Sequence, residues 1–418
     1  MPLQIDSRKL FKFKYLSIFL AGITWVISSL FVLQSSRSGD DWPNGQTPYW
    51  ILWRYGEITP RRVLDEALYW NNEWVTGQGR FYVLHWIESR FMFSYFTSET
   101  SYKFLQFLLL LTSGLFLCLY VYLLSKSVGL AAMTLLLLSI TVQYRPAFDP
   151  HISFAAMVPS LLIKTLASLC IFVVAIQKKS RWINWTLGLI VGLLYLSALL
   201  TYEFAFLLFP CFILSYLYVK LDSRETSLFK TLQNCLRFPP LLTVTIIWVS
   251  YFVFIFFFLR PNAVAISGAY VLGVSSASIS TFFTQLLSPL PITNLQSSFE
   301  IPAQIIDFLV YLVALLFALT YKFLFIEKRG RRFLVKSEHF GLKDGLARVV
   351  TMILISLTLW ATPAMMLSVQ PIWWSKSNLQ TPYLGVMVQE FGIAIFFATA
   401  INMYFGGRNV VQLNKRVK

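Results

Sequence analysis

The sequence predicts an all-α, polytopic integral membrane protein: a single transmembrane domain over residues 1–418. Of these residues 57% are hydrophobic and only 13% are charged, whereas about 25% are charged in an average soluble domain. The mean hydropathy of +0.64 agrees with this deficit. Lipid cannot hydrogen-bond to a peptide group, so such a chain must satisfy its backbone within helices. The composition excludes a disordered chain, a coiled coil and an ordinary cytosolic enzyme.

Transmembrane helices are predicted wherever an apolar run approaches the roughly 20 residues that a span requires. The run at 129–144 is short, and only Thr201-Tyr202-Glu203 separates two of the others. The ten predicted spans are 15–34, 104–125, 129–144, 153–177, 184–201, 203–219, 239–259, 303–322, 349–369 and 384–405.

The distribution of basic residues predicts the orientation of these spans. Of the 35 lysines and arginines, 24 lie in the terminal segments and in alternate loops, among them the basic loop 322–348. Because basic loops stay in the cytoplasm, both termini are expected on the cytoplasmic side of the inner (plasma) membrane. The net charge of +16 lies mainly in short loops between apolar runs, so it indicates orientation and contact with membrane lipids. It does not indicate nucleic acid. Residues 15–34 are expected to be a retained first span.

The largest predicted outer loop is 35–103, with eight of the 19 acidic residues and six of the 13 tryptophans. Thr59-Pro60 predicts a helix start, because Thr is a good N-cap and Pro suits the first helical position. Two amphipathic helices, about 61–70 and 80–96, are expected on the membrane surface; packing on other loops is the alternative. A second long outer loop, 260–302, is expected to hold a short helix near 277–287.

Carboxylates and glycines of the first outer loop supply candidate chemistry. Asp40 and Asp41 stand just beyond the first span, and a carboxylate at a membrane surface can act as a general base toward a hydroxyl. Arg80 follows two glycines, and its planar guanidinium matches phosphate oxygens. The alternative is a solvated acidic loop with glycine turns, and the spacing leaves both interpretations open.

Together these motifs resemble the GT-C class of membrane glycosyltransferases, in particular its GtrII-like and related bacterial glucosyltransferase-type members. An Asp-Asp-aromatic motif follows the first span, here Asp40-Asp41-Trp42. Trp74 and Gly79-Arg80-Phe81 match a second motif, and Tyr202-Glu203 matches an aromatic-Glu pair between two central spans. The resemblance is clearest over about 15–210.

The resemblance implies transfer, with inversion, of a sugar from a polyprenyl-phosphate donor to a surface glycan or a lipid-linked acceptor on the outer face. Asp41 or Asp40 would be the base, and Arg80 and Arg260 would contact the phosphate. No cofactor and no metal are expected. The other residues expected to contact substrate are Glu73, Trp74, Tyr202, Glu203, Asp149 and His151.

Several polar residues have a structural alternative to a role in the site. Asp149 and His151 lie in a second outer loop, where capping of the loop by Asp149 is the simpler interpretation. Lys164 and Glu390 lie within spans and are expected either to pair with each other across helices or to line a substrate site. A polar helix face toward water is expected for His85 and Glu88.

Two rival functions share these features. A transporter or flippase of lipid-linked sugar would need a continuous polar path through the helices, for which the polar residues within spans are sparse. A polymerase or ligase of surface polysaccharide would share the lipid-linked substrate and the large outer loop.

Overall fold

The computed structural model describes residues 7–37, 41–142, 144, 149–153, 156–220, 228–264, 273–290, 342–374 and 385–417. Within these residues all regular secondary structure is helical. Seven of the described helices are long and apolar enough to cross a membrane, and two apolar helices are shorter, Val128–Thr141 and Phe204–Lys220. The seven spans are Leu16–Gln34, Glu99–Ser125, Val158–Ile176, Arg181–Leu199, Pro239–Asn262, Leu346–Ser368 and Val386–Met403. The chain is therefore an all-α polytopic membrane protein.

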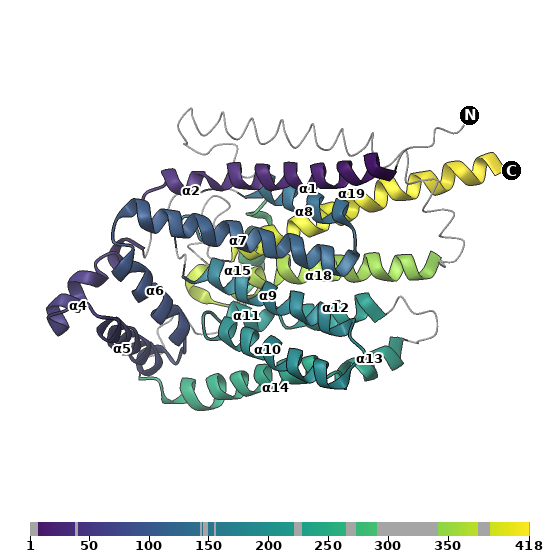
Figure 1. The fold of residues 1–418 in the computed structure, drawn as a ribbon. Coiled ribbons are helices and arrows are strands. Elements are labelled where there is room, and N and C mark those ends of the chain that lie inside the picture. The colour runs from purple at the N-terminus through teal and green to yellow at the C-terminus, as the bar shows by residue number, and fades with distance from the viewer. Residues whose placement is uncertain are drawn as a thin grey trace.

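The long helices lie side by side in one bundle (Figure 1). α18 packs against α19, α9 packs against α7 and α10, α1 packs against α8, and α10 packs against α14. The bundle helices are α1 (Ser7–Ser29), α2 (Phe31–Gln34), α7 (Glu99–Ser125), α8 (Val128–Thr141), α9 (Val158–Ile176), α10 (Arg181–Leu199), α11 (Phe204–Leu207), α12 (Pro210–Lys220), α14 (Pro239–Val253), α18 (Leu342–Ser368) and α19 (Val386–Val417).

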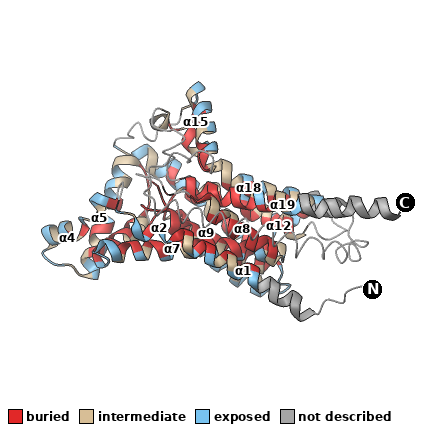
Figure 2. Cartoon of the chain, turned by 90° about the horizontal axis from the view of Figure 1, so that it is seen from above, coloured by how far each residue is buried: buried red, intermediate tan, exposed pale blue. Residues whose placement is uncertain are grey.

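Four shorter helices of the first loop gather at one end of the bundle, called the α6 end here (Figures 1 and 2). They are α3 (Asp41–Asn44), α4 (Thr47–Tyr55), α5 (Pro60–Gln78) and α6 (Val83–Tyr95). α1 begins and α19 ends at the opposite end (Figure 1). Further short helices are α13 (Leu228–Leu236), η1 (Phe254–Leu259), η2 (Arg260–Asn262), α15 (Ser276–Leu287) and η6 (Pro371–Trp373).

The predicted helices agree with most of this architecture. Nine of the ten predicted spans fall on helices of the described part, and 303–322 lies outside it. The two helices expected within the first loop are α5, which Thr59 caps by accepting a hydrogen bond from the backbone N–H of Arg62, and α6. They pack on each other and on α4, which agrees with the alternative of packing within the loop. The helix expected near 277–287 is α15. α3 and α4 were not predicted, because each is short and lacks a long apolar period.

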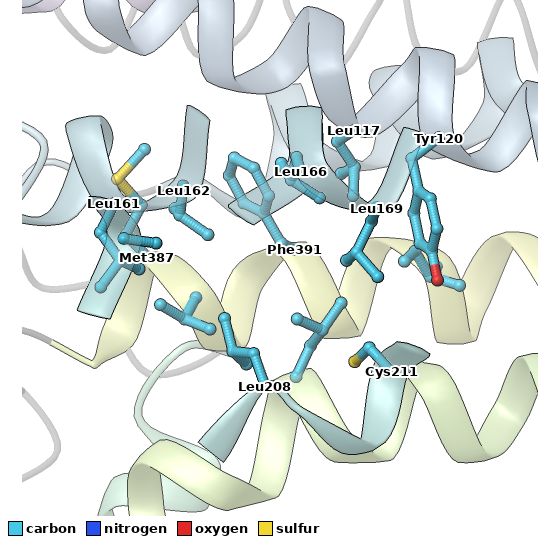
Figure 3. Packing of buried hydrophobic residues seen from close by; sticks show 14 of the residues in the cluster. Leu117, Tyr120, Leu161, Leu162, Leu166, Leu169, Leu208, Cys211, Met387 and Phe391 are labelled. Carbon is cyan, nitrogen blue, oxygen red and sulfur yellow. The ribbon is translucent and has the colours of Figure 1, made fainter. Parts of the chain in front are cut away.

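An apolar core fills the middle of the bundle (Figure 3). Leu117 and Tyr120 of α7 meet Leu166 of α9, Phe391 of α19 and Cys211 of α12 in one buried cluster. Among these, the Tyr120 hydroxyl lies 2.7 Å from the Ser215 hydroxyl. Because lipid is as apolar as these side chains, the helices gain mainly from dispersion contacts and close packing.

The backbones of α18 and α19 approach each other closely at Gly392. A Cβ added at Gly392 would lie 2.5 Å from both the Ser356 carbonyl oxygen and the Trp360 nitrogen of α18. We therefore expect Gly392→Ala to separate these backbones and to destabilise the fold by about 1–3 kcal/mol, measured as a fall in the melting temperature of the purified protein.

The same substitution at Gly22 of α1 is the control. No atom lies within 4 Å of a Cβ added there, and Ala is a better helix former than Gly. Gly22→Ala should leave the melting temperature unchanged or slightly raised. Equal losses in the two variants would contradict the close approach of α18 and α19.

Candidate functional site

Helix α6 lies across the ends of three bundle helices. The backbone N–H of Leu84 donates to the Leu200 carbonyl beyond α10, with 3.1 Å between N and O. Further along, Glu88 forms an ion pair with Lys164 of α9. The Phe93 ring stacks on Tyr102 of α7, with 4.7 Å between ring centroids. These contacts bring residues of the first loop against the ends of α10, α9 and α7.

Arg80 is the centre of the first charged cluster, the Arg80 group (Trp74, Arg80, Tyr82, Tyr202 and Glu203). Its Nη2 lies 2.9 Å from Oε1 of Glu203. Its guanidinium carbon lies 4.5 Å from the ring centroid of Tyr82, 5.4 Å from Trp74 and 5.6 Å from Tyr202. The cation is thus held by a carboxylate and three aromatic faces.

Arg260 lies next to this group. A Cβ added at Gly79 would stand 2.9 Å from the Cα of Arg260, and Gly79 has a φ of +64°. Both features require glycine at this position. Arg260 stacks over Phe256 of η1, with 4.6 Å from the guanidinium carbon to the ring centroid. The sequence predicted Arg80 and Arg260 as phosphate contacts, and their backbones are neighbours.

Asp41 is the centre of a second cluster, the Asp41 group (Asp41, Tyr102 and Lys103). The Asp41 side chain is buried, with the residue only 2% exposed. Its Oδ2 accepts a hydrogen bond from the Tyr102 hydroxyl at 2.6 Å. The alternative of a solvated acidic loop is therefore wrong for Asp41, while Asp40 lies outside the described residues.

Lys103 connects this group to a buried histidine. Its Nζ donates to the Ile152 carbonyl at 2.5 Å and to Gln106 Oε1 at 3.2 Å. One residue before Ile152, His151 Nδ1 lies 2.6 Å from Asp149 Oδ1 and Nε2 lies 2.8 Å from Glu390 Oε2.

Asp149 and His151 combine a local and a long-range contact. Asp149 Oδ1 also accepts from the His151 backbone N–H at 2.9 Å, so the expected capping is present. Burial by itself would lower the pKa of the imidazole, but the carboxylates of Glu390 and Asp149 raise it to about 10. His151 is therefore an imidazolium that joins the loop before α9 to α19.

Two expectations for charged side chains were wrong, one for Lys164 and Glu390 within spans and one for Glu88 on the loop helix. Lys164 and Glu390 do not pair with each other: Lys164 pairs with Glu88, and Glu390 pairs with His151. Glu88 is thus turned toward the bundle and not toward water, and its Oε2 also accepts from the Ser160 hydroxyl at 2.5 Å. The reason is that α6 lies on the bundle ends, where it supplies the opposite charge that a partly buried lysine requires.

Arg90 holds the loop helices together. It is 1% exposed, and its Nη1 donates to Thr47 Oγ1 at 2.6 Å and to Asn44 Oδ1 at 3.1 Å. Its guanidinium carbon lies 4.9–5.5 Å from the ring centroids of three tryptophans. Burial lowers the pKa of Arg90 to about 10. The tryptophans are Trp50 of α4, Trp70 of α5 and Trp86 of α6.

The two groups lie toward opposite ends of α6. Arg80 precedes its first residue, Val83, whereas Asp41 lies against the Tyr102 ring that stacks on Phe93. Ten residues of helix correspond to roughly 15 Å of backbone. The structure therefore does not place Asp41 and Arg80 in direct contact. Glu73 is exposed and belongs to neither group.

Tyr102, Lys103 and Glu88 are the site residues that the sequence did not reveal. The second predicted span begins at 104, because polar residues lower the hydropathy of the preceding turn. α7 in fact begins at Glu99, so Tyr102 and Lys103 lie on its first turns. The N-cap Ser98, which accepts from the Ser101 backbone N–H, was the available signal.

No family model, no curated protein and no solved structure matches this chain. No group of three or more His, Cys, Asp or Glu side chains in the described ranges is arranged to hold a metal ion. The candidate site rests on the Arg80 group with Arg260, the Asp41 group, and the charged pairs between them.

Two histidines, His85 on α6 and the buried His151, predict opposite pH dependences of stability. Burial, with Arg90, Lys164 and Arg80 nearby, lowers the pKa of His85 to about 4, below the unfolded value of about 6.5. Stability is therefore lost as pH falls below 6.5, by about 2 kcal/mol at pH 5. We expect His85→Gln to reduce the fall in melting temperature between pH 7 and pH 5.

For His151 the sign is reversed. Its folded pKa of about 10 lies above the unfolded value, so its stabilisation is complete below pH 6.5 and is lost as pH rises toward 10. His151→Gln should lower the melting temperature at pH 6 more than at pH 9.5. The same slope for wild type and both variants would contradict this assignment.

Proposed function

We propose that this protein is a membrane glycosyltransferase of the GT-C type that uses a polyprenyl-phosphate sugar as donor. The observation that carries the proposal is the burial of Asp41 with its carboxylate held by the Tyr102 hydroxyl. Burying a carboxylate is costly, and a loop residue without a role would remain solvated. A positioned carboxylate is what a general base requires.

In the proposed reaction Asp41 takes the proton of an acceptor hydroxyl. The hydroxyl oxygen forms a bond to the anomeric carbon of the donor sugar as the bond from that carbon to the phosphate oxygen breaks. Polyprenyl phosphate leaves with the bonding electron pair, and the configuration of the sugar inverts. Asp40, adjacent in the chain, is the alternative base.

Arg80 and Arg260 are the proposed phosphate contacts. With the donor lying along α6, its sugar would face Asp41 and its phosphate would face the Arg80 group. About 15 Å of helix separates the two groups. This length can hold, in a row, the Asp41 carboxylate, the acceptor hydroxyl, the anomeric carbon, the phosphate and an arginine side chain. The cations would offset the charge that grows on the leaving phosphate.

The position of the buried charges favours a transferase over a transporter. In the described part of the chain, the fully buried charged side chains lie in the first loop, on the first turns of α7 and α19, or in the segment before α9. The core between α7, α9, α12 and α19 is apolar (Figure 3). A transporter would need polar groups along the bundle, whereas a transferase needs them at one end only. The list of these buried charges is Asp41, Glu66, Arg80, Arg90, Lys103, Asp149, His151 and Glu390.

We place the α6 end on the outer face of the plasma membrane. Lys126 follows α7, Lys178 and Lys179 follow α9, and Arg237 precedes α14, at the end of the bundle away from α6. Basic residues between spans favour the cytoplasmic side. Both termini would then be cytoplasmic, and donor and acceptor would bind from the outside.

Asp41→Asn is expected to lower the rate of sugar transfer by about 10²–10⁴-fold, the usual contribution of a general base. The measurement is release of polyprenyl phosphate by the purified protein in nanodiscs, supplied with a panel of polyprenyl-phosphate sugars and with glycan or lipid-linked acceptors. Polymerised product would indicate the polymerase or ligase function.

Asp65→Asn is the matched control. Asp65 lies on α5 with its side chain 37% exposed, paired with Arg62 at 3.2 Å. The same chemical change there should leave the rate nearly unchanged, because exposed ion pairs contribute little. Release that is equal in wild type and Asp41→Asn would remove Asp41 from the mechanism. Movement of lipid across the bilayer without release would favour the flippase.

Arg260→Gln is expected to raise the KM for the lipid-linked donor roughly 10-fold, because one charge-assisted hydrogen bond to phosphate is lost. The control is Arg237→Gln, since Arg237 lies at the other end of the helix formed by α14, η1 and η2. An unchanged donor KM in Arg260→Gln, or an equal change in both variants, would contradict a phosphate contact.

A further inference from the structure

We propose that Tyr102 and Lys103, at the start of α7, are positioning residues that keep Asp41 ionised and fixed in orientation for proton transfer. The inference rests on the proposed function and assigns two residues that no sequence motif identified. Neither needs to touch the substrate, because each acts through the Asp41 carboxylate.

Tyr102 fixes the direction of the carboxylate. The separation of 2.6 Å between its hydroxyl and Asp41 Oδ2 is in the range of an O–H donor on an ionised acceptor. The ring itself cannot turn easily. It stacks on Phe93 with an interplanar angle of 19°, and the Arg37 guanidinium carbon lies 5.3 Å from its centroid.

Arg37 is held in turn by the chain around it. Its Nη2 donates to the Thr97 carbonyl at 2.8 Å, and its backbone N–H donates to Glu99 Oε1 at 2.8 Å. Tyr102 is therefore placed by Phe93 and Arg37 and presents its hydroxyl to Asp41 in one direction. A hydrogen bond to the charged form favours that form.

Lys103 supplies a positive field. It is 1% exposed, and within the described residues its ammonium forms no ion pair with a carboxylate at salt-bridge distance. Its hydrogen bonds go to neutral oxygens, of Ile152 and Gln106. Asp41 is nevertheless close enough to interact with it electrostatically. A buried cation acts over several ångströms because the interior screens it weakly.

The charges near this carboxylate do not cancel the effect of Lys103. Arg37 adds positive charge near Asp41. The two nearby carboxylates have other partners: Glu99 accepts a hydrogen bond from the Arg37 backbone N–H, and Asp149 pairs with the His151 imidazolium. The charged groups that interact with Lys103 besides Asp41 are Glu99 of α7, Arg37 before α3 and Asp149 before α9. Beyond them, Arg90 of α6 binds Asn44 of the helix that carries Asp41, and His151 joins Asp149 to Glu390 of α19.

The first test is Tyr102→Phe, which keeps the stacked ring and removes only the hydroxyl. We expect kcat for polyprenyl phosphate release to fall about 10- to 100-fold, with the KM values for donor and acceptor changed less than about 2-fold. The acid limb of the pH–rate profile should move to higher pH by about one unit, because the ionised carboxylate loses a donor.

Tyr120→Phe is the matched control. Tyr120 lies on the same helix, is fully buried, and loses a hydroxyl contact with Ser215 that measures 2.7 Å. It therefore undergoes the same loss of a buried hydrogen bond far from Asp41. Its kcat and pH–rate profile should match wild type. Equal changes in the two variants would mean that Tyr102 has only a structural role and would overturn the proposal.

Lys103→Met and Lys103→Arg test the charge independently. Lys103→Met should move the acid limb in the same direction as Tyr102→Phe, and Lys103→Arg should restore most of the wild-type profile. In an Asp41→Asn background, Tyr102→Phe and Lys103→Met should have no further effect on the residual rate, since both act through Asp41. A further loss of similar size in that background would overturn the proposal.

The outcomes separate this inference from the proposed function. Release by wild type that is abolished in Asp41→Asn and normal in Tyr102→Phe and Lys103→Met would overturn only the positioning roles. No release by wild type with any donor would overturn the proposed function, and the positioning roles with it.

Discussion

Burying a charge inside a membrane bundle is costly unless an opposite charge or several hydrogen bonds accompany it, and this constraint shapes the α6 end. Helix α6 places Glu88 beside Lys164 of α9, so that the lysine has an opposite charge. His151 lies between the carboxylates of Asp149 and Glu390 and supplies the opposite charge for both. The first loop is therefore not a detached surface appendage, because Lys164 of α9 finds its opposite charge there.

The same constraint explains why the loop is folded into helices that pack on one another. Arg90 is enclosed by tryptophans from α4, α5 and α6, and its donors reach Asn44 of α3. One buried cation thus ties four short helices together. This arrangement sets the position of Asp41, which begins α3, against the Tyr102 ring of α7. The structural role of Arg90 and the proposed chemical role of Asp41 are linked through α3.

Hydropathy and helix-start signals predicted most of the helices, because spans and caps are determined by local sequence. The family resemblance named Trp74, Arg80, Tyr202 and Glu203 as substrate contacts, and the structure places these side chains together. Their contact with a substrate stays a prediction. Hydropathy and helix-start signals could not predict which buried charges pair, since Lys164 finds its partner 76 residues away on α6. Tyr102 and Lys103 were missed because polar residues at the start of a span look like loop in a hydropathy profile. Long-range packing alone turns them toward Asp41.

We propose that the Arg80 and Asp41 groups hold the two ends of one lipid-linked sugar along α6. A cryo-EM structure in nanodiscs with a non-transferable polyprenyl-phosphate sugar analogue would locate both ends. We expect phosphate density within hydrogen-bond distance of Arg80 or Arg260, with the sugar on the Asp41 side of α6. Density for the headgroup at the opposite end of the bundle, or between α9, α12 and α19 along the core of Figure 3, would contradict it.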